Sequence, residues 1–144
     1  MAALHRRFVM LEALLRAALI DWLRADPTLT DLGAIREEAT GPITTPMLSI
    51  AASASRDWST KTESGREVRI VIEHRSRGDA ADTAIEMLST IEARVLALPR
   101  DQTGFTLVAS QFLRARNEKR SHNLRSSLLE FRFLLLTTPQ GEPA

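Results

Sequence analysis

The chain has 144 residues, of which 44% are hydrophobic and 26% charged, and its formal net charge at pH 7 is +1. This length fits one domain with its own core, and the composition is ordinary for a globular protein. The sequence contains no cysteine, which excludes disulfides, thiolate nucleophiles and cysteine-bound zinc. The most hydrophobic N-terminal stretch, Phe8 to Leu23, is interrupted by Glu12, Arg16 and Asp21. It therefore predicts neither a membrane span nor a signal peptide, and we expect a soluble intracellular protein.

The first predicted element is a helix over residues 3–25, which Pro27 ends. One face of this helix carries mainly large apolar side chains: Leu4, Phe8, Leu11, Leu15, Ala18, Leu19 and Trp22. Burying each large aliphatic side chain is worth roughly 1.5–3 kcal/mol, so a core position is favoured over a partner-binding surface.

The pattern weakens over residues 26–46, where only a short helical piece at 32–38 is indicated. Residues 47–54 then predict a strand. Residues 53–65 are polar around a single Trp58, which is typical of a long exposed connection or of the far part of a hairpin. Trp58 fits equally well as a lid over the edge of the core and as an aromatic anchor in an interface.

The chain is organised around residues 66–98, which predict a strand, a turn at Gly78 and an amphipathic helix ended by Pro99. In the strand, apolar residues alternate with charged ones. In the helix, over residues 81–98, apolar side chains recur at a helical spacing: Ala81, Ile85, Leu88, Ile91, Val95 and Leu98.

Two further strands are predicted at residues 105–116 and 124–137, joined by a polar turn at 117–123. The order helix-strand-strand-helix-strand-strand predicts an α+β protein: a mainly antiparallel four-stranded sheet with two long helices packed on one face. We expect a single domain over residues 1–138 and a flexible C-terminal tail at 139–144.

The sequence shows no combination of residues that is typical of a catalytic site. The three histidines, His5, His74 and His122, stand in different elements without a second ligand at metal-binding spacing. No nucleophile elbow and no phosphate-binding glycine loop occurs. The sequence therefore predicts no enzyme, no cofactor and no metal site.

One charge feature stands out in the last predicted hairpin, where five basic residues face a single nearby acid, Glu118. These are Arg114, Arg116, Lys119, Arg120 and Arg125. They fit a solvated hairpin tip, and they also fit a contact with DNA phosphates or with an acidic patch on a partner. No aromatic residues interleave with them, which argues against stacking on single-stranded bases.

The segment Asp57-Trp58-Ser59-Thr60-Lys61-Thr62, followed by Gly65-Arg66-Glu67, an alternating strand and the 80–98 helix, resembles a family of small tail-completion proteins. Members belong to tailed bacteriophages, prophages and gene transfer agents. The resemblance extends over most of the chain, and the segment from the tryptophan to Gly-Arg-Glu is its most specific part.

This family is similar to tail terminators of long, non-contractile tails. The resemblance implies a structural virion protein that forms a homo-oligomeric, hexameric ring on the head-proximal end of the tail tube. Its partners would be the tail tube protein and a head-completion or adaptor protein, with DNA passing through the lumen and no membrane contact. Assembly would take place in the bacterial cytoplasm. The implied subunit or tube interface comprises Asp57, Trp58, Thr60, Lys61, Gly65 and Arg66.

Two alternatives remain at this stage. One is a head-completion or stopper protein on the other side of the same joint. The other, of a different class, is a small nucleic-acid-binding protein that uses the basic hairpin at residues 114–125.

Overall fold

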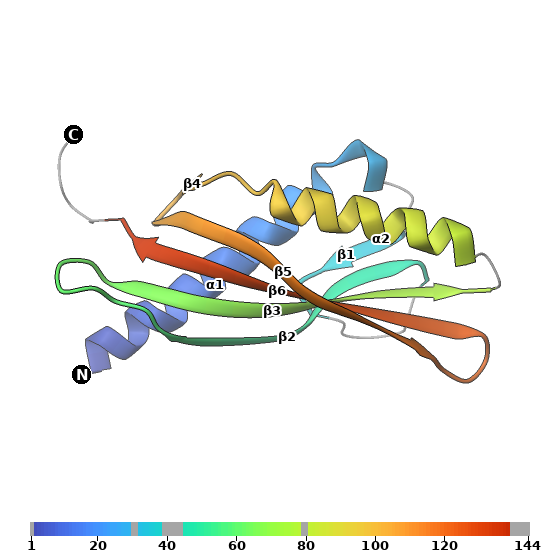
Figure 1. The fold of residues 1–144 in the computed structure, drawn as a ribbon, viewed down its shortest axis with the longest axis horizontal. Helices are drawn as coiled ribbons and strands as arrows, with labels where there is room; N and C mark the ends of the chain where they lie inside the picture. Colours follow the sequence, from blue (N-terminus) through green and yellow to red (C-terminus); the bar gives the residue numbers. More distant parts are fainter. Residues whose placement is uncertain (1, 30–31, 39–44, 79–80, 139–144) are drawn as a thin grey trace.

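The computed structural model describes residues 2–29, 32–38, 45–78 and 81–138, so the expected tail at 139–144 lies outside the described residues. Each of the two long helices is followed by a group of strands (Figure 1). The elements are α1 (Ala2–Arg24), a short 3-10 helix (Pro27–Leu29), β1 (Ala34–Arg36), β2 (Met47–Asp57), β3 (Gly65–Arg77), α2 (Ala81–Leu96), β4 (Asp101–Gln102), β5 (Phe105–Lys119) and β6 (Leu124–Thr137).

All six strands form one curled sheet in the order β1-β2-β3-β6-β5-β4. β1 is parallel to β2, and every other pair is antiparallel. The chain is an α+β protein, but the prediction of a four-stranded, mainly antiparallel sheet is wrong. β1 replaces the helical piece expected at residues 32–38, and β4 was not expected at all. These strands have only 3 and 2 residues, too few to show a period in the sequence.

Two long hairpins, β2–β3 and β5–β6, extend to opposite ends of the molecule (Figure 1). β2 continues to Asp57 and β5 to Lys119, so both strands are longer than predicted. β-bulges interrupt β2 between Ile50 and Ala52 and β5 at two places. Because a bulge bends its strand and increases its twist, these irregularities contribute to the curl of the sheet.

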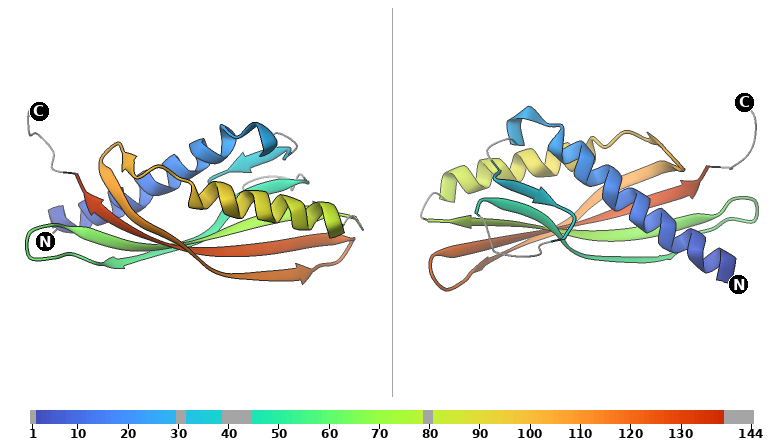
Figure 2. Two further views of the ribbon diagram at one scale, coloured as in Figure 1. Left: turned by 45° about the horizontal axis from the view of Figure 1, so that its top comes forward. Right: turned by 180° about the vertical axis from the view of Figure 1, so that it is seen from behind.

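One hydrophobic core joins both helices to one face of the sheet (Figure 2). The sheet contributes alternate residues of the two central strands. The fully buried ones include Val68, Ile70 and Ile72 of β3, and Phe131, Phe133 and Leu135 of β6. Leu15, Leu19 and Leu23 of α1 and Ile91 and Val95 of α2 cover them.

Trp22 of α1 and Arg94 of α2 form a clasp, that is, a set of hydrogen bonds and a cation–π contact that connects the two helices. The Trp22 indole Nε1 donates a hydrogen bond of 2.7 Å to the Arg94 carbonyl, and the Arg94 guanidinium donates bonds of 3.0 and 2.7 Å to the Trp22 carbonyl. The guanidinium carbon lies 3.3 Å from the indole ring centroid, a cation–π contact. This pairing holds the C-terminal turn of α1 against α2.

Candidate functional site

The tip of the β2–β3 hairpin contains the tryptophan segment and is held by its own hydrogen bonds. Asp57 accepts bonds on Oδ1 from the Ser59 amide at 3.2 Å and from the Ser59 hydroxyl at 2.6 Å. The Gly65 amide donates to Ser59 Oγ at 3.0 Å, and the Trp58 amide donates to the Gly65 carbonyl at 3.0 Å. An Asx-turn at Asp57 thus closes the loop onto the start of β3.

A second set of bonds completes the tip and ties it to the end of β6. The Thr60 amide donates to the Glu63 carbonyl at 2.8 Å, and the Glu63 amide donates to Thr60 Oγ1 at 3.0 Å. The amide and the hydroxyl of Thr137 both donate to the Ser64 carbonyl at 2.9 Å. The projecting loop is therefore a fixed part of the sheet.

The close packing around Gly65 requires a glycine at this position. A Cβ there would lie 2.6 Å from the Trp58 carbonyl oxygen and 3.0 Å from that of Leu135. Both neighbours are backbone atoms, one directly after β2 and one in β6, so they cannot turn away as a side chain could. Glycine allows β2, β3 and β6 to approach one another here.

The predicted interface residues divide into an outward and an inward group. Three side chains are exposed, Trp58 and Arg66 are partly buried, and Gly65 is buried. The exposed residues are Asp57, Thr60 and Lys61. The exposed side chains and the accessible parts of Trp58 and Arg66 can reach another molecule without rearrangement, whereas Gly65 shapes the tip.

The tip of the β5–β6 hairpin is a tight turn. His122 and Asn123 have φ values of 60° and 62°, and the Leu124 amide donates to the Ser121 carbonyl at 3.4 Å. Two successive residues in the left-handed region are what a type I′ hairpin turn requires, and asparagine tolerates that region well.

The basic residues of this hairpin have more acidic neighbours than the sequence indicated. Arg114 contacts Glu130 at 3.3 Å. Arg116 and Arg120 contact Glu118 at 2.7 and 3.3 Å. The sheet places Glu130 beside this group because β6 pairs with β5.

Two further basic residues were predicted here, and they occupy different positions. Arg125 donates through Nε to the Gly78 carbonyl at 3.2 Å, so it helps to join the turn after β3 to the hairpin. Lys119 is exposed next to the tip.

The face of the sheet opposite the core, which we call the charged face, has a buried carboxylate at Glu67. Its Oε1 accepts a bond from Arg132 Nε at 2.7 Å, and its Oε2 accepts one from Arg56. Arg69 lies 3.5 Å from Oε1. The Arg132 hydrogen bond, with a further contribution from Arg56, outweighs burial and lowers the pKa of Glu67 from 4.5 to about 2.

A second carboxylate on the charged face, Glu73, lies near the other end of β3. Ser126 Oγ donates to its Oε2 at 2.5 Å, Arg75 is 3.0 Å away and Arg120 is 3.9 Å away. Burial by itself raises the pKa of Glu73, but the bonds from Ser126 and Arg75 prevail and lower it below its ordinary value. Glu73 thus connects the basic hairpin tip to β3.

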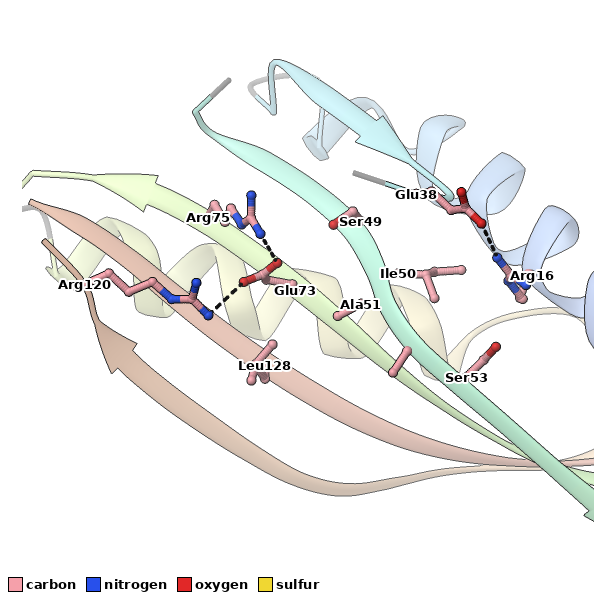
Figure 3. A pocket seen from close by; sticks show the side chains of 11 residues that line it. Arg16, Glu38, Ser49, Ile50, Ala51, Ser53, Glu73, Arg75, Arg120 and Leu128 are labelled. Atoms are coloured by element: carbon pink, nitrogen blue, oxygen red, sulfur yellow. Dashed lines mark hydrogen bonds and ion pairs between the residues drawn. The ribbon is translucent and has the colours of Figure 1, made fainter. Parts of the chain in front are cut away.

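An open recess of about 560 Å³ runs across β2, from Glu73 and Arg120 on one side to Arg16 of α1 on the other (Figure 3). Arg75 and Arg120 point towards Glu73 from one side, and an Arg16–Glu38 pair lies on the other side (Figure 3). Ser49 in its wall is buried, and its hydroxyl has no hydrogen-bond partner within the described part of the chain. The recess is polar and shallow, and it holds no nucleophile paired with a general base.

Comparison with known proteins shows which family this chain belongs to. Residues 17–136 match the family described as Tail completion protein gp17. The chain belongs to this family. Tail completion proteins are structural components, so membership gives the protein a structural role in a phage-type tail. No curated protein matches the sequence at a significant level.

A solved structure supports this assignment to the tail completion proteins. A chain of the virion of a native gene transfer agent (GTA) particle is 25% identical to this one, with a TM-score of 0.76. The match covers 86% of this chain and 96% of that chain. The tail completion fold described above is thus similar to that of a component of an assembled particle.

The rest of the search for a site in this tail completion protein finds no metal cluster. Among residues 10–29, 32–38, 45–78 and 84–138, no group of three or more potential ligands lies together. His74 is buried on the core side of β3, where loss of hydration lowers its pKa and favours the neutral imidazole. None of the helices in the described ranges has both the length and the hydrophobicity of a membrane span.

The low pKa of Glu67 predicts a measurable loss of stability in acid. Because the folded-state value lies below the unfolded one, Glu67 stabilises the fold above about pH 4.5, and this stabilisation is lost as the pH falls towards about 2. We expect Glu67→Gln to lower the free energy of unfolding by about 1 kcal/mol at neutral pH, since Arg56 and Arg69 are largely exposed and screened by solvent.

Urea unfolding of both proteins between about pH 7 and pH 3 tests this expectation. The wild type should lose more stability than Glu67→Gln over the acid part of that range. If the free energy of unfolding changed equally with pH in the two proteins, Glu67 would not be the cause of the acid sensitivity.

Proposed function

We propose that this protein is a tail terminator, a ring on the head-proximal end of the tail tube that stops tube polymerisation and joins the tail to the head. The match to the tail completion family over residues 17–136 carries the proposal. The structural likeness to a chain of a GTA virion supports it. The ring's neighbours would be the tube protein on one side and a head-completion or adaptor protein on the other, with DNA crossing the lumen.

The shape of the chain suits a head-to-tail ring. Such a ring needs two different surfaces on each copy, because every subunit offers one patch to the neighbour before it and another to the neighbour after it. The two hairpins extend to opposite ends of the molecule and differ in chemistry (Figure 1). One tip has the half-buried Trp58 and the other has exposed arginines.

Deleting the gene and imaging the particles by negative-stain electron microscopy tests the function directly. Overlong tubes without heads are the result expected for a terminator. Tails of normal length beside detached, filled heads would instead assign the protein to the head side of the joint. Intact, infectious or transducing particles would overturn both assignments.

The half-buried Trp58 is the predicted anchor of the ring. We expect Trp58→Ala to leave the fold intact and to raise the concentration needed for half-maximal assembly by about tenfold or more, since truncating an aromatic anchor typically costs at least about 2 kcal/mol. Mass photometry on an assembling wild type gives the measurement. Thr62→Ala, an exposed change in the same tip, serves as the control.

An unchanged assembly mass and midpoint for Trp58→Ala would remove Trp58 from the interface. Circular dichroism of the unassembled protein checks that the substitution has not unfolded the hairpin.

A further inference from the structure

Strands cover only a short part of each edge of the sheet, and the uncovered parts lie at opposite ends. β1 pairs with residues 47–49 of β2, and β4 pairs with residues 105–106 of β5. Within the described part of the chain, no strand pairs with the outer side of β2 over residues 50–57 or of β5 over 108–119. At Leu107 the outer side is occupied, because its amide donates to the Arg100 carbonyl at 2.7 Å. Each short strand covers one end of its long neighbour and leaves the other end free.

The free part of β2, residues 50–57, contains no lysine and no proline, and the Arg16–Glu38 ion pair lies across the recess from its first residues. Ala51, Ala52 and Ala54 are exposed, and no charged residue or proline occurs before Arg56. Monomeric proteins normally block such edges with lysine, proline or a covering element, because unpaired backbone N–H and C=O groups are a template for another strand. Small, uncharged side chains allow a second backbone to approach closely.

The free part of β5, residues 108–119, is a second long edge, which runs in the opposite direction. The successive pairs β2–β3, β3–β6 and β6–β5 are all antiparallel, so β2 and β5 point opposite ways within one sheet. A rotation about an axis that runs roughly along the strands preserves their direction, and a tilt of the strands to that axis staggers neighbouring copies, as in a barrel. The β5 edge of a neighbouring copy would therefore meet β2 in the antiparallel orientation, which is the more stable pairing.

We propose that the free edge of β2 in one copy pairs with the free edge of β5 in the next copy, so that the sheets of the ring join into one continuous sheet. This inference rests on the proposed ring and specifies the surface by which its subunits meet. The occupant of the β2 edge is a second copy of this chain. Closing the ring pairs every free edge, as closure does in a barrel.

The short edge strands limit how far two copies can slide. β1 prevents a neighbour from pairing along residues 47–49, and β4 together with Arg100 prevents it along 105–107. The joined strands must therefore be staggered, with the free part of β2 beside the middle or outer part of β5. In such a sheet the charged faces of all copies form one surface, with the helices on the other side.

Introduced cysteines test the pairing, because the natural chain has none. Ala52 and Ala54 lie on the charged face, opposite Val71 and Arg69 of β3. On β5, the residues on the same face are Ala109, Gln111, Arg114 and Arg116, opposite Leu134, Arg132, Glu130 and Leu128 of β6. Each double variant would carry one cysteine on β2 and one on β5. Disulfides between copies would be detected on non-reducing gels after mild oxidation of assembled particles.

The expected result is a ladder of covalent oligomers for matched pairs and none for the single-cysteine variants. A disulfide needs Cα atoms about 4.4–6.8 Å apart, so only residues that face each other across the two strands should react well. In an antiparallel pair, facing residues are numbered in opposite directions, so a lower number on β2 faces a higher number on β5. If Ala54→Cys reacts best with one position of β5, Ala52→Cys should react best with a position nearer to Lys119.

A control pairs Ala54→Cys with Ile85→Cys on α2, where the side chain is 62% exposed. Ladders of equal strength for this control would overturn the inference, since they would reflect random contact. Particles that contain the protein in normal amount but give no ladder with any edge pair would overturn it as well. In that case the terminator proposal would stand, because only the deletion phenotype decides it.

Discussion

Replacing Phe131 by alanine should lower the free energy of unfolding by about 3–5 kcal/mol, the usual cost of removing a buried aromatic side chain. Phe131 is fully buried in β6, between β3 and β5. Its ring meets Phe112 edge-on with centroids 5.7 Å apart and stacks on Phe133 at 6.3 Å. The cavity left by its removal would therefore lie where three strands and both aromatic neighbours meet.

Urea unfolding of the unassembled protein measures this cost, with Leu134→Ala as a matched control. Leu134 is in the same strand but on the charged face, and it is only partly buried. We expect its truncation to cost clearly less. Equal losses for the two variants would mean that the core is not centred on the aromatic residues of β6.

Gly65→Ala should cost about 2–3 kcal/mol, towards the upper end of the range for overpacking, because the added methyl group meets two backbone oxygens. Relief requires β3 to move away from β2 or β6, which would break the bonds that close the tryptophan loop. The fluorescence of Trp58 should shift as the loop opens, and assembly should weaken together with stability.

Ser64→Ala is the matched control for this change. Ser64 uses its carbonyl, not its hydroxyl, to hold Thr137, so the substitution should leave the loop closed. Stability of Gly65→Ala within about 0.5 kcal/mol of the wild type would contradict the close approach seen at this position.

Periodic segments of the sequence predicted their elements well. α1, β3, α2 and β6 each carry a repeating apolar face, because each buries one side against the same core. The outer parts of β2 and β5 lack such a face, since they extend past the core as hairpin arms, and both strands were therefore predicted too short. The parallel pairing of β1 with β2 was not predicted, because β1 has only three residues and no local pattern marks it.

The candidate site was predicted in part for the same reason. The tryptophan segment is contiguous, so its resemblance to the tail-completion family could be seen directly in the sequence, and its role in an interface stays a prediction. The carboxylate at Glu67 was missed as a charge centre, because Arg132 is 65 positions away in the chain. Charged residues alternating along β3 and again along β6 are the signal that could have indicated it, since opposite charges on paired strands stabilise one another.

The clasp between Trp22 and Arg94 has a practical consequence for measuring folding and assembly separately. The chain contains only two tryptophans, and they lie in unlike surroundings. Trp22 is fixed between the helices under a guanidinium, so its emission reports whether the helices are docked. Trp58 lies at the tip of the β2–β3 hairpin and, in the proposed ring, would sense a neighbouring subunit. A protein that keeps only Trp22 is therefore an optical probe of folding. A protein with Trp22→Phe keeps only Trp58 and would report assembly of the proposed ring.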